Sequence, residues 1–139
     1  MKKIIVASHH KLANGFKDTL EYILPNTVEI IDISAYLENV SVDKQIDEVL
    51  SNFTKEEQIF VFTDISGGSV NQAFIRRLND YNIELISGTN LSILISIATQ
   101  LGEENIDKDT IREEIINAAS EIVYVNDKLA SQSLDEDDE

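Results

Sequence analysis

Short apolar runs rich in β-branched residues alternate along this chain with longer segments whose apolar residues recur every three or four positions. The short runs are typical of strands, and the longer segments are typical of amphipathic helices. Strands are predicted at residues 3–7, 28–33, 58–63 and 83–86, and helices at residues 11–24, 42–53 with Ser41 as N-cap, 70–81, 91–101 and 109–120. This alternation favours an α/β fold with an open, mostly parallel, doubly wound sheet and helices on both of its faces.

The length of the chain, 139 residues, fits one domain, and no linker or internal repeat divides it. The predicted domain covers residues 1–126. The apolar, β-branched stretch at residues 122–125 predicts a last strand at the end of this domain. Residues 127–139 are polar and end in five consecutive acids, which predicts a disordered acidic tail.

Composition excludes several classes of function. The chain has no cysteine, which rules out disulfides, thiolate chemistry and zinc sites with cysteine ligands. The net charge of -15 makes nucleic acid and anionic membranes unfavourable partners, and it favours solubility or the steering of a basic partner protein. The apolar run at the N-terminus is too short for a signal peptide or a membrane span, so a cytoplasmic protein is expected.

The chain contains two histidines, His9 and His10, which follow one another at the end of the first predicted strand. Asp64 follows the third predicted strand. Open parallel sheets bind ligands at the carboxyl ends of their strands, at the point where the strand order reverses. The expected strand order is 2-1-3-4. In this order the point lies between strands one and three, so His9 and Asp64 are expected to face each other.

This pair fits phosphoryl transfer. A neutral imidazole nitrogen is a good nucleophile near pH 7, and a carboxylate on the other ring nitrogen fixes the tautomer and stabilises the positive charge that develops. Gly67, Gly68 and Ser69 precede a predicted helix, so their backbone amides can cradle a phosphate, to which the hydroxyls of Ser69 and Ser8 add hydrogen bonds. The same residues also fit plainer roles, Asp64 as a strand-end cap and Gly-Gly-Ser as a turn.

No nucleotide-binding glycine motif occurs in the sequence, and two adjacent histidines are a poor metal site, so neither a cofactor nor a metal is expected. Three motifs in order do match one family. They are Ile4-Ile5-Val6-Ala7-Ser8-His9, then Asp64-Ile65-Ser66-Gly67-Gly68-Ser69 as D-x-x-G-G-S, then Gly88-Thr89-Asn90-Leu91 as G-x-N-L. Over residues 1–126 the chain resembles the enzyme IIA component of the mannose-type (mannose/fructose/sorbose) sugar phosphotransferase system.

The resemblance implies a phosphocarrier. His9 would accept a phosphoryl group from HPr, Asp64 would orient the imidazole, and Ser69 would bind the phosphate in a loop shaped by Gly67 and Gly68. The group would pass to enzyme IIB, which phosphorylates the sugar at the membrane components IIC and IID. The family also forms homodimers in which a C-terminal strand, here residues 122–125, crosses to the other subunit.

The chain departs from the family pattern at two places. The family usually has glycine after the active histidine, where this chain has His10. It often has S-P-x-N after the glycines, where this chain has Ser69-Val70-Asn71-Gln72.

Other functions stay open at this point. The phosphotransferase subunit of a dihydroxyacetone kinase begins with a similar domain, although it often carries further phosphocarrier domains. A flavodoxin-like binding module has a related strand order, but it needs a Ser/Thr/Gly-rich loop after strand one and aromatic residues around a flavin. Here that loop is His-His-Lys-Leu, there is no tryptophan, and the tyrosines are expected away from the strand exits. A domain phosphorylated only as a signal is a further alternative. The sequence does not identify the sugar.

Overall fold

Four parallel strands form the sheet of this protein, whose computed structural model describes residues 2–36 and 39–137. The strands are β1 (Lys3–His9), β2 (Glu29–Ala35), β3 (Ile59–Thr63) and β4 (Ile83–Ile86). Their order across the sheet is β2-β1-β3-β4, and each neighbouring pair is parallel. The predicted strand order is therefore confirmed, and the carboxyl ends of all four strands lie at one edge of the sheet.

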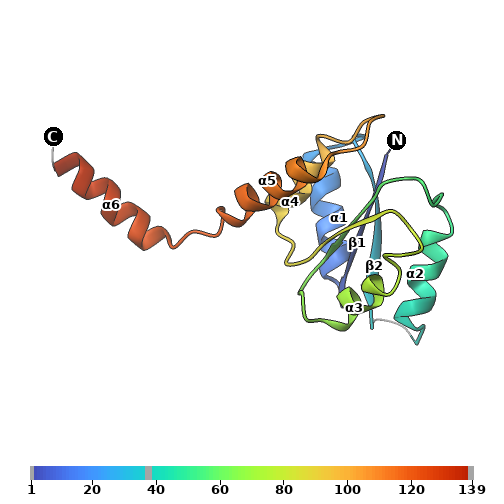
Figure 1. Ribbon diagram of the computed structural model, residues 1–139. Coiled ribbons are helices and arrows are strands. Elements are labelled where there is room, and N and C mark those ends of the chain that lie inside the picture. The colour runs from blue at the N-terminus through green and yellow to red at the C-terminus, as the bar shows by residue number, and fades with distance from the viewer. Residues whose placement is uncertain (1, 37–38, 138–139) are drawn as a thin grey trace.

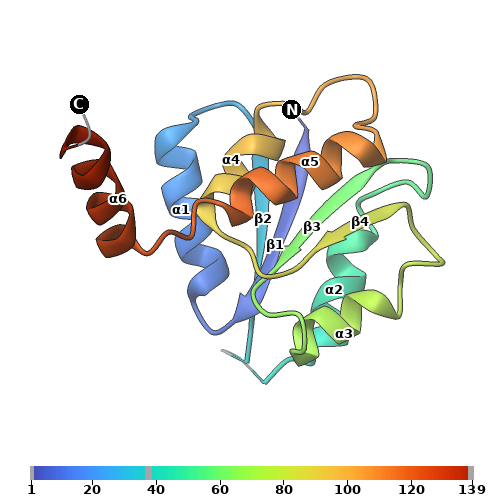
Figure 2. The same cartoon turned by 60° about the vertical axis from the view of Figure 1, so that its left-hand side comes forward.

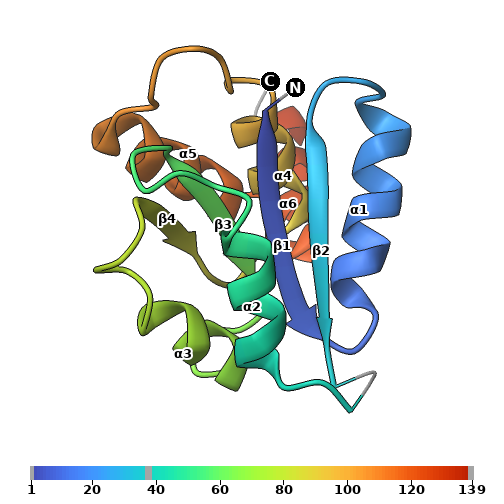
Figure 3. The same cartoon turned by 90° about the vertical axis from the view of Figure 1, so that its right-hand side faces the viewer.

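Helices cover both faces of the sheet, as predicted for a doubly wound fold. The helices that do so are α1 (Leu12–Ile23), α2 (Val42–Leu50), α3 (Ser69–Ile75), α4 (Leu91–Ala98) and α5 (Lys108–Ala119). A further helix, α6 (Val125–Asp137), follows them in the chain. Figures 2 and 3 show α1, α4 and α5 on one face and α2 and α3 on the other. No helix in the described part of the chain combines the length and the apolar composition that crossing a membrane requires.

The two apolar layers arise from the pleat of the central strands. Successive side chains of a strand point to opposite faces. In β3, Phe60 and Phe62 pack with α1, α4 and α5, whereas Ile59 and Val61 pack with α2 and α3. All five residues of β3 are buried, which confirms the prediction of a strand enclosed between two helical layers.

The helix boundaries follow local capping. Ser41 accepts a hydrogen bond from the Lys44 amide and so begins α2, as predicted. Helix α3 is shorter than the predicted 70–81, because after Ile75 the backbone closes tighter turns, such as the hydrogen bond from the Arg77 amide to the Phe74 carbonyl oxygen. The guanidinium of Arg77 binds Asp47 on α2, and this ion pair anchors the turn to the neighbouring helix.

The C-terminal segment differs from the prediction. Among the described residues, β4 pairs with β3 alone, and residues 122–125 form no strand because the backbone there leads away from the sheet. Residues 125–137 form α6, which projects from the body (Figure 1) where a disordered tail was predicted. The local sequence contains good helix formers, such as Leu129 and Ala130, and an acid in the first turn, so an acidic composition does not prevent a helix. Residues 138–139 lie outside the described residues.

His10 provides a test of the backbone at the end of β1. Its φ of 56° is left-handed, and its amide donates to the Ala35 carbonyl oxygen at 2.9 Å. A left-handed conformation costs a residue with a Cβ about 1–2 kcal/mol. His10→Gly would relieve this strain, but glycine also has more conformational entropy in the unfolded chain, which offsets part of the gain. We therefore expect the free energy of unfolding to rise by roughly 0.5–1 kcal/mol. Urea unfolding followed by circular dichroism measures this, and a less stable variant would contradict it.

Candidate active site

The structure brings His9 and Asp64 together, although 55 residues separate them in sequence. His9 is the last residue of β1, and Asp64 directly follows β3, the neighbouring strand. The Nδ1 atom of His9 lies 2.8 Å from Oδ2 of Asp64, and the backbone amide of His9 donates to the same oxygen at 2.8 Å. The facing arrangement predicted from the strand order is thus present.

The carboxylate of Asp64 determines which nitrogen of His9 is available for chemistry. Burial raises the pKa of Asp64, but hydrogen bonds from the His9 amide, the His9 ring and the Ile65 amide outweigh it and hold that pKa below its usual range. An ionised carboxylate only accepts hydrogen bonds, so Nδ1 carries the proton. The lone pair of the neutral ring therefore lies on Nε2.

The two side chains differ in their access to solvent. The Asp64 side chain is 11% exposed, whereas the His9 side chain is 38% exposed. A sheltered carboxylate and an accessible imidazole let another protein reach His9 while the hydrogen bond that orients the ring stays protected.

The loop after β3 packs against the His9 ring. A Cβ on Gly68 would lie 3.1 Å from Cε1 of His9 and 3.3 Å from the carbonyl oxygen of Ile65, so any other residue there would require the ring or the loop to shift by a few tenths of an ångström. The hydroxyl of Ser69 lies 3.5 Å from Nε2 of His9, at the outer limit of a hydrogen bond. Gly67 has open space around its Cβ position, so packing does not require glycine there.

The amides of this loop are only partly free to hold a phosphate. The Gly68 amide donates to the Ile65 carbonyl oxygen at 3.2 Å and so closes the turn itself. Of the three amides predicted to hold a phosphate, those of Gly67, Gly68 and Ser69, the middle one is therefore already hydrogen-bonded within the loop. The hydroxyl of Ser69 is the side-chain donor that the loop presents to Nε2.

Ser8 does not lie with these groups, in contrast to the prediction. It is 1% exposed, and its hydroxyl accepts a hydrogen bond from the Ala13 amide at 2.6 Å. Adjacent residues of a strand point to opposite faces, so Ser8 and His9 diverge. Ser8 holds the first turn of α1 and is not part of the surroundings of Nε2.

Tyr36 is a site residue that the sequence analysis missed. Its ring stacks on the His9 ring, with the centroids 5.4 Å apart and an interplanar angle of 28°. Its hydroxyl forms a hydrogen bond with the hydroxyl of Ser69. The expectation that the tyrosines lie away from the strand exits is wrong here, because β2 continues to Ala35, two residues beyond its predicted end.

Asn71 is a second residue that sequence reasoning did not single out for a role. It is 6% exposed. Its Oδ1 accepts from the Thr63 hydroxyl, and its Nδ2 donates to the Ser66 carbonyl oxygen, both at 2.9 Å. These hydrogen bonds fasten the loop that carries Asp64 to the start of α3. The position of Asn71 just after the Gly-Gly-Ser motif was the available signal.

The third motif lies beside the same loop and supports it. The Thr89 hydroxyl donates to the Thr63 carbonyl oxygen at 2.7 Å, and Gly88 takes a left-handed φ of 72°. Asn90 caps α4 through the Ile93 amide and donates to the Ala118 carbonyl oxygen at 2.8 Å. The motif is therefore structural in this chain: it fixes the exit of β4 and joins it to α5.

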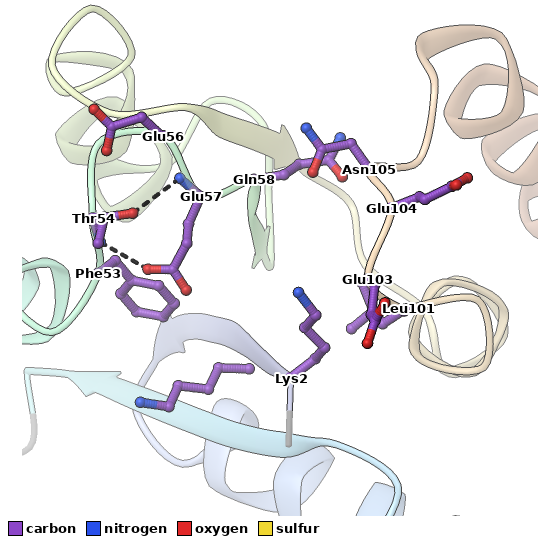
Figure 4. Close-up of a pocket in the computed structure, with 12 residues that line it drawn as sticks. Lys2, Phe53, Thr54, Glu56, Glu57, Gln58, Leu101, Glu103, Glu104 and Asn105 are labelled. Atoms are coloured by element: carbon purple, nitrogen blue, oxygen red, sulfur yellow. Dashed lines mark hydrogen bonds between the residues drawn. The ribbon is translucent and has the colours of Figure 1, made fainter.

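A cavity of about 350 Å³ lies away from this site, at the opposite edge of the sheet (Figure 4). Lysine side chains from the start of β1 and glutamates from two loops line it, including Lys2, Glu57 and Glu103. It shares no lining residue with the surroundings of His9. Among the side chains that the structure describes, in residues 2–36 and 39–133, no three histidine, aspartate or glutamate side chains lie together in a way that could hold a metal ion.

Comparison with known proteins bears on the chemistry of this site. A family model, EIIA-man, described as the PTS system fructose IIA component, matches residues 3–116. A solved structure from Klebsiella pneumoniae, described as a phosphoenolpyruvate-dependent sugar phosphotransferase system (PTS) permease, is 34% identical, with a TM-score of 0.82 over 93% of this chain and 95% of that one. No curated protein matches the sequence at a significant level.

Two more distant structures share the fold. The mannose/sorbose specific IIA subunit of the phosphotransferase system from Enterococcus faecalis is 20% identical, with a TM-score of 0.73 over 88% of this chain and 94% of that one. The phosphotransferase system component EIIA from Streptococcus agalactiae is 24% identical, with a TM-score of 0.72 over 91% of this chain and 98% of that one.

The lowered pKa of Asp64 predicts a pH dependence of stability. A carboxyl with a depressed pKa stabilises the fold above its unfolded pKa of about 3.9, and this contribution is lost as the pH falls through the folded value. We expect Asp64→Asn to unfold with a free energy roughly 1–2 kcal/mol lower than the native chain near neutral pH. The difference should shrink below about pH 4. Urea unfolding of both proteins at several pH values measures it; a difference that is constant down to acid pH would contradict the assignment.

Proposed function

This chain belongs to the mannose-type enzyme IIA family of the sugar phosphotransferase system, and from this membership we propose that it is a cytoplasmic phosphocarrier that accepts a phosphoryl group on His9. HPr is the proposed donor and enzyme IIB the proposed acceptor. Enzyme IIB then phosphorylates the sugar at the membrane components IIC and IID, and this chain does not itself contact the sugar.

The observation that carries the proposal is the orientation of the His9 ring. Nδ1 is held by Asp64 at 2.8 Å, and the ring is 38% exposed, so a partner protein can reach the Nε2 lone pair. A histidine on a loop without such a partner would rotate freely and would present both nitrogens. Here one nitrogen is fixed as a donor and the other as the nucleophile.

The chemistry follows from this arrangement. The Nε2 lone pair of His9 forms a bond to phosphorus while the N–P bond of the donor's phosphohistidine breaks, and the electron pair of that bond returns to the donor ring. The His9 ring keeps its Nδ1 proton and becomes positively charged, and the Asp64 carboxylate beside it stabilises that charge. Transfer to the acceptor reverses these steps and restores the neutral ring.

The first test separates the two histidines. The protein is incubated with phosphoenolpyruvate, enzyme I and HPr, and acid-labile phosphate on the chain is measured. We expect His10→Ala to be phosphorylated like the native protein and His9→Ala to take up none. The reason is that Asp64 is hydrogen-bonded to the His9 ring, whereas the His10 ring has no such partner among the described residues. Uptake by His9→Ala and none by His10→Ala would overturn the assignment.

Asp64→Asn serves as the matched comparison in this assay, since it keeps the size of the side chain. An amide cannot stabilise the charged ring, so phosphorylation should slow by about 10²-fold or more while the final site stays His9. An unchanged rate would reduce Asp64 to a structural cap of the loop.

The C-terminal segment supports a second part of the proposal, a homodimer. Ile122 and Tyr124 are 81% and 67% exposed, and the outer edge of β4 has no neighbouring strand among the described residues. An open sheet edge and an exposed apolar, β-branched segment each favour pairing with another chain. A second copy of this chain can supply the pairing through residues 122–125, and two-fold dimers are the commonest closed assemblies.

Truncation after Ser120 tests the homodimer. The full chain is expected to sediment as a dimer at micromolar concentration, and the truncated chain as a monomer, because the truncation removes the proposed contact. Circular dichroism of the truncated chain checks that the sheet remains folded. A full-length chain that sediments as a monomer would contradict the proposal directly.

A further inference from the structure

Tyr36 contacts both the His9 ring and Ser69, the residue whose hydroxyl faces the Nε2 atom of His9. Its ring stacks on the imidazole at 5.4 Å, and its hydroxyl is hydrogen-bonded to the hydroxyl of Ser69. The Ser69 hydroxyl in turn lies 3.5 Å from Nε2. Three side chains from the ends of β1 and β2 and the start of α3 thus form one connected row.

The direction of the hydrogen bonds in this row follows from Asp64. Because the carboxylate accepts a hydrogen bond from Nδ1, Nε2 is an acceptor, and the Ser69 hydroxyl has to donate its proton toward it. The oxygen of Ser69 is then free to accept, so the Tyr36 hydroxyl is the donor in the bond between them. The row has a single polarity, from Tyr36 through Ser69 to His9.

We propose that Tyr36 is a positioning residue of the active site, which acts through Ser69 by keeping the serine hydroxyl turned toward Nε2 as a donor. This inference rests on the proposed function of His9 as the phosphoryl acceptor. No other side chain in the described part of the chain is hydrogen-bonded to the Ser69 hydroxyl besides Tyr36 and His9.

The same donor order, from Tyr36 to Ser69 to the His9 site, holds in the unphosphorylated and in the phosphorylated protein. When Nε2 forms its bond to phosphorus, its lone pair is used, and the Ser69 proton turns to a phosphoryl oxygen that now occupies the acceptor position. Tyr36 continues to donate to the oxygen of Ser69. Neither hydroxyl loses a proton, the Nδ1 proton stays with His9, and the only bonds exchanged are the two N–P bonds.

The backbone of Tyr36 is consistent with a role that is not simply structural. Its φ of 67° is left-handed, and the side chain is more than half exposed. This conformation strains a tyrosine, whose Cβ crowds the backbone, but would not strain a glycine. Residues held in such conformations cluster at functional sites, where the surrounding structure maintains them.

A double-mutant cycle tests the proposal, with the rate of phosphoryl uptake from phosphorylated HPr as the measurement. Tyr36→Phe keeps the stacked ring and removes only the hydroxyl, so it isolates the hydrogen bond to Ser69. We expect it to slow uptake by about fivefold to tenfold. If Tyr36 acts through Ser69, the double variant Tyr36→Phe/Ser69→Ala should match Ser69→Ala within about twofold.

Two results would overturn the proposal. One is a Tyr36→Phe protein that takes up phosphate at the native rate while Ser69→Ala is slow. The other is a double variant whose loss is the product of the two single losses, because independent action would then be shown. Tyr22→Phe is the matched control: Tyr22 lies exposed on α1, and its substitution should leave the rate unchanged.

A second measurement does not depend on phosphorylation. In the unphosphorylated protein, the ¹⁵N resonance of Nε2 reports whether a donor faces its lone pair. Tyr36→Phe and Ser69→Ala should both shift it toward the value of a lone pair without a donor, and Tyr22→Phe should not. A native protein that takes up no phosphate would refute the proposed function, whereas an Nε2 resonance unmoved by Tyr36→Phe would refute the role of Tyr36.

Discussion

The parallel pairing of β1 with β3 is the constraint on which the rest of this structure depends. The two strands lie at the centre of the sheet, and their alternating apolar side chains supply both helical layers with a core. The same register aligns Ala7 with Thr63, so the next residues along each strand, at the open edge, include His9 and Asp64. Folding energy and site geometry therefore have one source: burial of β1 and β3 sets the positions from which an imidazole and a carboxylate meet at 2.8 Å.

Around this pair, the polar side chains divide into those that support the loops and those that face the ring. Asn71 and Thr89 are hydrogen-bonded to the end of β3 and hold the loops that leave β3 and β4. Ser69 and Tyr36 face the His9 ring from α3 and from the end of β2. Asn71 is buried, and both ends of its side-chain amide are hydrogen-bonded, because an unpaired polar group inside the protein is costly. Ser69 and Tyr36 are exposed and so stay accessible to a partner.

The C-terminal segment shows how an apolar, β-branched sequence can lack a strand. A strand is stable only with a neighbour to which its backbone can be hydrogen-bonded. Residues 122–124 have no such neighbour in the part of the chain that the structure describes, and α6 continues beyond them with its residues exposed up to position 133. The apolar, β-branched composition of this segment predicts a strand, but a strand forms only where the edge of another strand is available for pairing.

The sequence by itself determined the class of the fold and, for a strand order of 2-1-3-4, the meeting of His9 with Asp64. It could do so because hydrophobic periodicity is local, and because parallel strands bring their carboxyl ends to one edge. The tertiary structure decided what lies around that pair. Ser8 points into the protein to hold α1, the Gly68 amide closes its own turn, and Tyr36 reaches Ser69 across 33 residues of sequence. Those outcomes depend on where β2 ends and on how the loops pack. Both are set by contacts between residues far apart in sequence, so a local pattern of residues does not predict them.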